Sequence, residues 1–240
     1  VGLANAEGAV FNEFYLFFSF ESFFFCSLKF VSLNLFSFKY RFSQSSIGVQ
    51  EVSSRMIRID NLVKNYGDFQ ALKSVSFDIH DGEILGFLGA NGAGKSTTLK
   101  IMTGYLAPTA GNVLVDGQNV VDDSFEIREQ IGYLPETNPL YIEMKVFDYL
   151  QFIAQVRGLE GKAFHQGFAR VVEQCGLSEV IHKPIATCSK GFKQRIGLGA
   201  AMIHDPKILI LDEPVSGLDP NQIVEIRELI KNLGREKLVI

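Results

Sequence analysis

The chain has 240 residues, enough for one large domain or two small ones. Its net charge of −4 gives no overall basic character, so we expect no nucleic acid partner. The three cysteines, Cys26, Cys175 and Cys188, lack metal-binding spacing and are odd in number. These counts argue against a disulfide framework and favour a reducing compartment.

Residues 1–55 differ in composition from the rest of the chain, with 12 of the 21 phenylalanines and 10 serines. A membrane-spanning helix needs about 18 nearly uncharged apolar residues. No uncharged run in this segment is longer than residues 30–38, which have half of that length. A signal peptide fits poorly because no basic region precedes the apolar part, and an interfacial segment, which stays open, lacks a cationic face. Met56 is the first methionine, so we expect residues 1–55 to be translated upstream sequence and the domain to begin at Met56.

Two alternating patterns follow, around residues 57–60 and 75–80, and predict half-exposed strands. Tyr66 lies between them. An aromatic side chain at this place either stacks on a purine or is an ordinary loop tyrosine, and both interpretations stay open. Asp81-Gly82 is a turn signal, and the apolar run at residues 84–88 that comes after it predicts a short buried strand.

The next residues satisfy the phosphate-loop pattern G-x-x-x-x-G-K-[ST] with Gly89, Gly94, Lys95 and Ser96. Glycines let backbone N–H groups turn toward a polyphosphate, and the helix that begins here adds unpaired donors and a positive dipole. Lys95 would neutralise the β- and γ-phosphates, and the Ser96 hydroxyl would bind Mg²⁺. A chance glycine-rich turn is disfavoured, because the residue types and both flanking elements agree.

The middle of the chain predicts a strand near residues 113–115, a short helix at 124–131 and a strand at 131–134. Helical spacing then recurs over residues 141–156 and 164–175. These two helices predict a helical insertion between two halves of a sheet. A further helix is expected over residues 190–203.

Four consecutive aliphatic residues at 208–211 predict a fully buried parallel strand, with helices on both faces of its sheet. Asp212 and Glu213 follow at the carboxyl end, where α/β sheets place their ligands. Asp212 is suited to hold Mg²⁺, and Glu213 to accept a proton from an attacking water. A solvated turn is the weaker interpretation, because a phosphate loop lies in the same chain. A helix over residues 221–233 and a strand from residue 237 complete the pattern.

Together these residues resemble the nucleotide-binding subunit of an ATP-binding-cassette (ABC) transporter, from Met56 to Ile240. ILILDEP at 208–214 resembles the Walker B strand with its catalytic glutamate, and SGLD at 216–219 resembles the D-loop, with Asp219. The resemblance implies an α/β P-loop NTPase with a central, mostly parallel sheet, an N-terminal antiparallel β subdomain and a helical insertion. It implies a Walker A loop, GANGAGKST, and ATP contacts from Tyr66, Gly89, Ala90, Asn91, Gly92, Ala93, Gly94, Lys95, Ser96 and Thr97.

CSKGFKQR at 188–195 stands where the family has its LSGGQ signature. The chain departs from that form at Cys188, Lys190 and Phe192. The resemblance implies that the signature contacts ATP in trans through Ser189, Lys190, Gly191 and Gln194. The S-K-G variant resembles the exporter branch whose membrane subunits are separate chains. YLPETNPLY and LDPNQIVEIREL look most similar to gliding-motility-associated ABC ATPases. Glu136 stands at the family's Q-loop glutamine and is implied as a further Mg²⁺ ligand.

The resemblance also implies partners and a place in the cell. Two copies would pair head to tail as a homodimer, and a separate transmembrane permease subunit would hold them at the cytoplasmic face of the membrane. The segment after Glu136 and the helices up to residue 176 would transmit the motion. The family's switch histidine would fall a few residues beyond Ile240, so we expect a C-terminally truncated domain that binds nucleotide better than it hydrolyses it.

Other function classes agree less well with these residues than a transport ATPase does. A soluble ABC ATPase of DNA repair needs a long coiled coil between Lys95 and Ser189, and that interval has no sustained heptads. Translation types carry two cassettes, whereas this chain has one. A P-loop kinase has no evident use for the DEP and SGLD segments. A purely regulatory nucleotide-binding module is the remaining alternative. We therefore expect an ATPase that uses Mg²⁺ and powers a membrane exporter.

Overall fold

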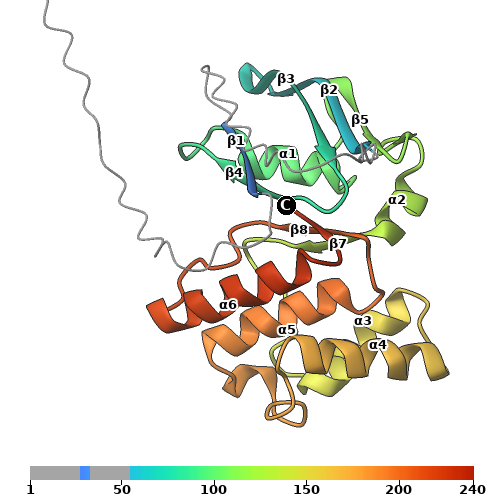
Figure 1. Cartoon of the computed structure of the whole chain (residues 1–240), viewed down its shortest axis with the longest axis vertical. Coiled ribbons are helices and arrows are strands. Elements are labelled where there is room, and N and C mark those ends of the chain that lie inside the picture. The colour runs from blue at the N-terminus through green and yellow to red at the C-terminus, as the bar shows by residue number, and fades with distance from the viewer. Residues whose placement is uncertain (1–27, 33–54) are drawn as a thin grey trace, which may run out of the picture.

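The computed structural model describes residues 28–32 and 55–240 (Figure 1). Most of the segment interpreted as upstream sequence, residues 1–55, lies outside the described residues. Within that segment, β1 (Leu28–Ser32) pairs in parallel with β4 (Ile84–Leu88). The strands of the described residues form two sheets. One is parallel, with the strand order β1-β4-β9-β8-β7, and the other is antiparallel, with the strand order β3-β2-β5-β6.

The antiparallel sheet is built on one long hairpin. Its strands are β2 (Arg55–Tyr66), β3 (Phe69–His80), β5 (Ala110–Val115) and β6 (Gln118–Asn119). β2 and β3 have 12 residues each, longer than predicted, because irregularities in their register let the pairing continue past Ile59. Tyr66 therefore ends a strand and pairs with Phe69 across the turn, instead of lying in a loop between two short strands.

The parallel sheet is covered on both faces, as predicted. Its other strands are β7 (Ile131–Leu134), β8 (Ile208–Leu211) and β9 (Leu238–Val239). Every side chain of β8 is buried, and successive side chains point to opposite faces. Leu209 and Leu211 enter one hydrophobic core, whereas Ile208 and Ile210 enter a second one.

Helices divide between these two cores. The first core holds four helices that lie together in Figure 1, namely α3 (Val146–Val156), α4 (Gly161–Gln174), α5 (Lys190–Met202) and α6 (Pro220–Leu233). The second core holds α1 (Lys95–Met102), α2 (Ser124–Gln130) and the antiparallel sheet. The predicted α/β fold, with its antiparallel subdomain and helical insertion, is confirmed. None of the helices in the described part of the chain is long and apolar enough to cross a membrane.

The start of α3 differs from the sequence prediction. The apolar spacing predicted a helix from residue 141, but α3 begins at Val146. Residues 141–145 instead pair with the segment before α5: the N–H of Ile185 donates to the carbonyl of Met144, and that of Ala186 to the carbonyl of Ile142, both at 2.9 Å. These partners are distant in sequence, so local periodicity cannot reveal them.

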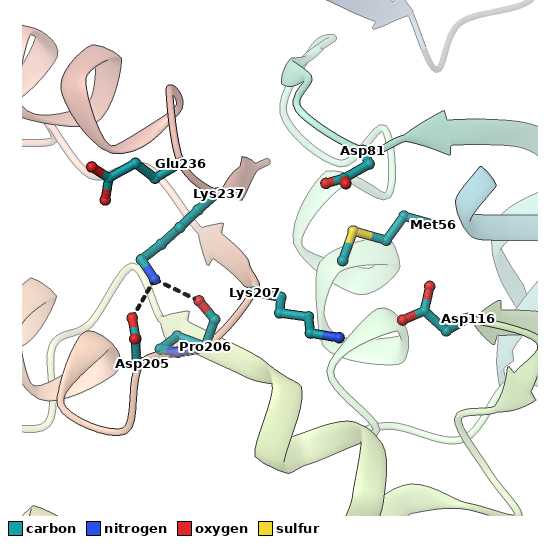
Figure 2. A pocket seen from close by; sticks show the side chains of 8 residues that line it. All are labelled: Met56, Asp81, Asp116, Asp205, Pro206, Lys207, Glu236 and Lys237. Carbon is teal, nitrogen blue, oxygen red and sulfur yellow. Dashed lines mark hydrogen bonds and ion pairs between the residues drawn. The ribbon is translucent and has the colours of Figure 1, made fainter. Parts of the chain in front are cut away.

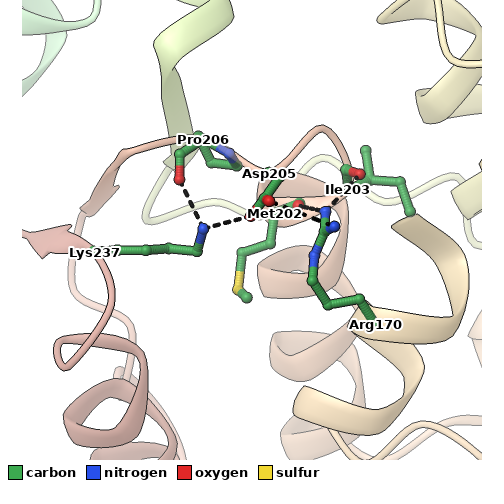
Figure 3. A network of polar contacts seen from close by, with 6 residues as sticks. All are labelled: Arg170, Met202, Ile203, Asp205, Pro206 and Lys237. Atoms are coloured by element: carbon green, nitrogen blue, oxygen red, sulfur yellow. Dashed lines mark hydrogen bonds and ion pairs between the residues drawn. The ribbon is translucent and has the colours of Figure 1, made fainter. Parts of the chain in front are cut away.

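A polar network fixes the helices to the sheet at the amino ends of the parallel strands (Figure 3). Lys237 Nζ donates to Asp205 Oδ1 at 2.6 Å and to the Pro206 carbonyl at 2.9 Å. Arg170 on α4 donates to the carbonyls of Met202 and Ile203 at the end of α5, and its Nη1 lies 3.6 Å from Asp205 Oδ2. Lys237 is only 8% exposed, so its carboxylate partner is needed to offset the burial of its charge.

A pocket of about 440 Å³ opens at the same edge of the sheet (Figure 2). Acidic and basic side chains from turns next to strands of both sheets line it, together with two uncharged ones: Met56, Asp81, Asp116, Asp205, Pro206, Lys207, Glu236 and Lys237. Parallel strands present their amino ends here, whereas the phosphate loop follows the carboxyl end of β4. This pocket is therefore separate from the predicted nucleotide site.

Candidate nucleotide-binding site

The phosphate loop connects β4 to α1 in the order that the sequence predicted. Gly92 and Gly94 have φ values of +81° and +87°, in the left-handed region that glycine adopts freely. A Cβ added at Gly94 would lie 2.5 Å from Leu72 Cδ2 and 2.8 Å from the Ala71 carbonyl oxygen. The end of the loop is thus pressed against β3, and only glycine fits there.

Lys95 is the first residue of α1, and its ammonium lies across the loop. Its Nζ donates to the carbonyls of Gly89 at 2.8 Å and Ala90 at 3.2 Å. The loop residues 89–92 are exposed, so their backbone is accessible to a ligand. The amino terminus of α1 adds free N–H groups and a positive partial charge, and an anion is the ligand that this combination favours.

Ser96 and Asp212, 116 residues apart, meet at the candidate metal site. Ser96 Oγ donates to Asp212 Oδ1 at 3.1 Å. Asp212 is 4% exposed, and its own N–H donates to the Leu134 carbonyl at 2.9 Å, which fixes it to β7. A hydroxyl and a carboxylate are ligands that Mg²⁺ prefers. Within residues 28–32 and 55–240, the structure contains no cluster of three or more acidic, histidine or cysteine side chains that could hold a metal ion.

Glu213 is exposed next to buried Asp212, and its backbone is strained. Its φ is +51°, a conformation that costs a residue with a Cβ about 1–2 kcal/mol. The N–H of Ser216 donates to its carbonyl at 3.0 Å and closes the turn. Glu136 is exposed two residues beyond β7, the strand beside β8. Both carboxylates therefore follow neighbouring strands at the same edge of the sheet.

Sequence reasoning missed Tyr133, which lies on β7 beside this site. Burial, followed by the negative charge of Asp212, raises the pKa of Tyr133 to about 12. Its buried Oη has no hydrogen-bond partner within the described residues. The pattern of the segment IGYL predicts only a strand, whereas in the structure the charge of Asp212, which follows the neighbouring strand β8, acts on this hydroxyl.

The signature residues lie at the start of α5. Ser189 caps the helix and accepts a hydrogen bond from the N–H of Phe192 at 3.3 Å, and Lys190 is exposed in the first turn. Gly191 packs on α6, where a Cβ would lie 3.0 Å from Gln222 Cδ. Gln194 is partly exposed one turn further along α5, whereas Asp219 caps α6 and accepts from the Gln222 N–H at 3.0 Å.

The signature helix and the phosphate-loop helix pack in different cores. α5 belongs to the helical core, and α1 lies between the two sheets (Figure 1). The fold therefore brings the Walker A and Walker B residues together within the chain, but keeps its own signature on the other face of the parallel sheet. Tyr66, 49% exposed, lies at the tip of the β2–β3 hairpin.

Comparison with known proteins identifies this arrangement. A family profile described as "ABC transporter" matches residues 72–216, more than half of the chain. The chain belongs to the ABC transporter family. The expected family membership is confirmed, and a soluble repair or translation ATPase is not favoured. The similarity to gliding-motility-associated members stays a prediction.

Several ABC transporter ATP-binding proteins are similar to this chain. The uncharacterized protein YxlF of Bacillus subtilis (strain 168) is 39% identical over 185 residues, which cover 77% of this chain and 61% of that protein. The bacitracin transport protein BcrA of Bacillus licheniformis is 36% identical over 184 residues, 77% of this chain and 59% of that protein. The chain thus spans about three fifths of the length of these relatives.

Solved structures of ABC transporter subunits share the fold. CbiO1 from Clostridium perfringens, described as part of the transporter complex cbiONQ, superposes with a TM-score of 0.69 at 29% identity, covering 78% of this chain and 77% of that one. The ADP conformation of the cassette MJ1267 gives a TM-score of 0.69 at 23% identity, over 78% of this chain and 79% of that one, a likeness of fold.

Proposed function

We propose that this ABC transporter chain binds and hydrolyses ATP with Mg²⁺ and thereby powers a membrane exporter. The observation that carries the proposal is the contact between Ser96 and Asp212, which joins the phosphate loop to the acidic strand. Phosphoryl transfer depends on positioning and on stabilising the charge of the phosphates. The loop N–H groups and Lys95 bind the phosphates, while Ser96 and Asp212 would hold Mg²⁺, which would supply positive charge beside the phosphates. Glu213, exposed at the same edge, accepts a proton from the attacking water.

The second half of each site comes from a second copy of the chain. Because α5 packs on the opposite face of the sheet from α1, the signature of one copy is free to meet the phosphate loop of another. The free N–H groups at the start of α5, near Ser189 and Gly191, then donate to the γ-phosphate together with Lys190 and Gln194. ATP closes this head-to-tail homodimer, and hydrolysis releases it.

A separate permease subunit docks on an apolar surface beside β7, and so holds the chain at the cytoplasmic face of the membrane. A groove of about 190 Å³ lies between the end of β7, α3 and α5. Tyr141, Ile142, Phe152 and Val156 are large exposed apolar side chains on or before α3. The centroid of the Tyr141 ring lies 5.6 Å from that of Phe152, so these two side chains share one apolar surface. Exposed apolar patches of this kind mark protein interfaces.

The names of the relatives support a transport role. BcrA is named for bacitracin transport, YbhF of Escherichia coli (strain K12) as a probable multidrug transporter protein, and cbiO1 as part of a transporter complex. The S-K-G form of the signature at Ser189–Gly191 agrees with the exporter branch.

The test of hydrolysis compares steady-state Mg²⁺-ATP turnover of the full chain with that of Glu213→Gln. Loss of a general base predicts a fall of about 10²- to 10⁴-fold, while ATP binding is retained. Measurable turnover that is equal in the two proteins would refute the assignment of Glu213.

The test of membrane docking is co-purification from membranes. Val156→Glu places a charge in the apolar patch and is expected to abolish co-purification with the permease while ATP binding stays unchanged. The matched control is Glu160→Lys, an exposed charge change just after α3. Equal co-purification of Val156→Glu and the parent chain would contradict this docking surface.

A further inference from the structure

The β2–β3 hairpin holds a lysine against the exposed Tyr66. Lys64 and Tyr66 are two residues apart on β2, so their side chains lie on the same face of the strand. Lys64 Nζ lies over the ring of Tyr66, 5.4 Å from its centroid. The same Nζ donates to the carbonyl of Ala107 at 2.8 Å. The ammonium is thus held between a carbonyl oxygen and one face of an aromatic ring.

The loop that carries the Ala107 carbonyl is fixed to β2 through Thr109. The N–H of Thr109 donates to the Val63 carbonyl at 2.8 Å. In return, the N–H of Asn65 donates to Thr109 Oγ1 at 3.0 Å. The loop that follows α1 is therefore tied to the strand on both sides of Lys64, and the position of the ammonium is set by the fold.

We propose that Lys64 is a positioning residue for the adenine of ATP: it holds the Tyr66 ring from one face so that the base stacks on the other. The inference rests on the proposed binding of ATP, and it takes Tyr66 as the side chain that stacks on the base, one of the ATP contacts that the family resemblance implies. A half-exposed tyrosine that is free to change rotamer loses that freedom when a ligand orders it. A ring that is already held in place loses less conformational freedom on binding, so the ligand binds more tightly.

The expected effect is small and specific to the base. An exposed cation–π contact is weak and corresponds to about a twofold to fivefold change in affinity. Lys64 acts on the ring and not on the phosphates, so a ligand that lacks a base should not sense it. Arginine also lies over aromatic rings as a cation, and it should replace lysine here.

The experiment measures the affinity of the full chain for ATP and for inorganic tripolyphosphate by titration calorimetry. For Lys64→Gln we expect the Kd of ATP to rise about threefold, with the Kd of tripolyphosphate unchanged. Lys64→Arg should keep the ATP affinity of the parent. Lys73→Gln is the matched control, since it removes the same charge from an exposed position on the neighbouring strand β3 and should change neither Kd.

Two results for Lys64→Gln would overturn the inference: an equal loss of affinity for both ligands, which indicates a general charge effect, and unchanged or tighter ATP binding. Tyr66→Ala separates this failure from that of the proposed function. It should weaken ATP binding more than Lys64→Gln does, and adding Lys64→Gln to it should have no further effect. If Tyr66→Ala leaves ATP binding unchanged, the adenine platform and the inference both fail. If only Lys64→Gln is silent, the role of Lys64 fails and the platform stands.

Discussion

Two glycines of the phosphate loop offer a matched pair of substitutions, Gly94→Ala and Gly92→Ala. Both have left-handed φ values, +87° and +81°, so alanine is strained by about 1–2 kcal/mol at either position. The smaller entropy of the unfolded chain offsets about 0.4–1 kcal/mol of this. Only at Gly94 does the new Cβ overlap neighbours, Leu72 Cδ2 at 2.5 Å and the Ala71 carbonyl at 2.8 Å, whereas nothing lies within 4 Å at Gly92.

The overlap at Gly94 should add about 1–3 kcal/mol, because a close-packed site must shift to accept an extra methyl group. We therefore expect Gly94→Ala to lower the free energy of unfolding by about 2–4 kcal/mol and Gly92→Ala by about 1 kcal/mol. Urea unfolding without nucleotide, followed by circular dichroism, measures both and excludes any contribution from ligand binding. Equal losses in the two variants would show that the loop does not press on β3 at Gly94, and would refute the reasoning.

Three further predictions concern other parts of the molecule. Lys237→Met removes a buried ammonium whose Nζ lies 2.6 Å from Asp205 Oδ1, and should lower the free energy of unfolding by about 1–3 kcal/mol in urea titrations. The control Lys231→Met loses only an exposed ion pair with Glu228, and should change the free energy of unfolding by less than about 0.5 kcal/mol. Equal losses would contradict the role of the network. Burial first, and then the charge of Arg157, lowers the pKa of His204 to about 4. Between pH 6.5 and about 4 the unfolded chain therefore binds more protons than the folded chain, so the free energy of unfolding falls as the pH falls, by up to about 1.4 kcal/mol per pH unit. His204→Gln should remove this pH dependence. An unchanged dependence in unfolding titrations of the variant would contradict the prediction. Ser96→Ala removes the hydrogen bond to Asp212 and should weaken ATP binding in the presence of Mg²⁺ but not when a chelator removes the metal, as titration calorimetry can measure. Equal weakening in both conditions would contradict a role of Ser96 in binding Mg²⁺.

Local patterns predicted those elements whose structure is decided locally. The four aliphatics at 208–211 form β8 with both faces buried, because such a run has no other stable place in an α/β domain. The start of α3 was predicted wrongly, since residues 141–145 satisfy their backbone groups with residues 184–186, far along the chain. The full length of β2 was missed for the same kind of reason: its register irregularities have no signal in an alternating pattern.

The candidate site likewise contains residues that a local pattern predicts and residues that only their neighbours in space distinguish. The phosphate loop and the acidic pair could be predicted because their chemistry fixes residue type and spacing, and the fold brings Ser96 within hydrogen-bond distance of Asp212. Tyr133 and Lys64 were missed because what distinguishes each of them is a neighbour in space. Tyr133 becomes notable only through its nearness to Asp212, and Lys64 only once β2 is known to extend to Tyr66.

The central claim is that two copies of this chain close on ATP, and the molecular mass in solution tests it most directly. Glu213→Gln is expected to bind ATP without turning it over, so light scattering with and without Mg²⁺-ATP should show a change from one chain to two, with two nucleotides per dimer. Adding Ser189→Arg at the amino terminus of α5 should prevent the change while one ATP per chain still binds. A single chain with ATP bound in Glu213→Gln itself would contradict the claim.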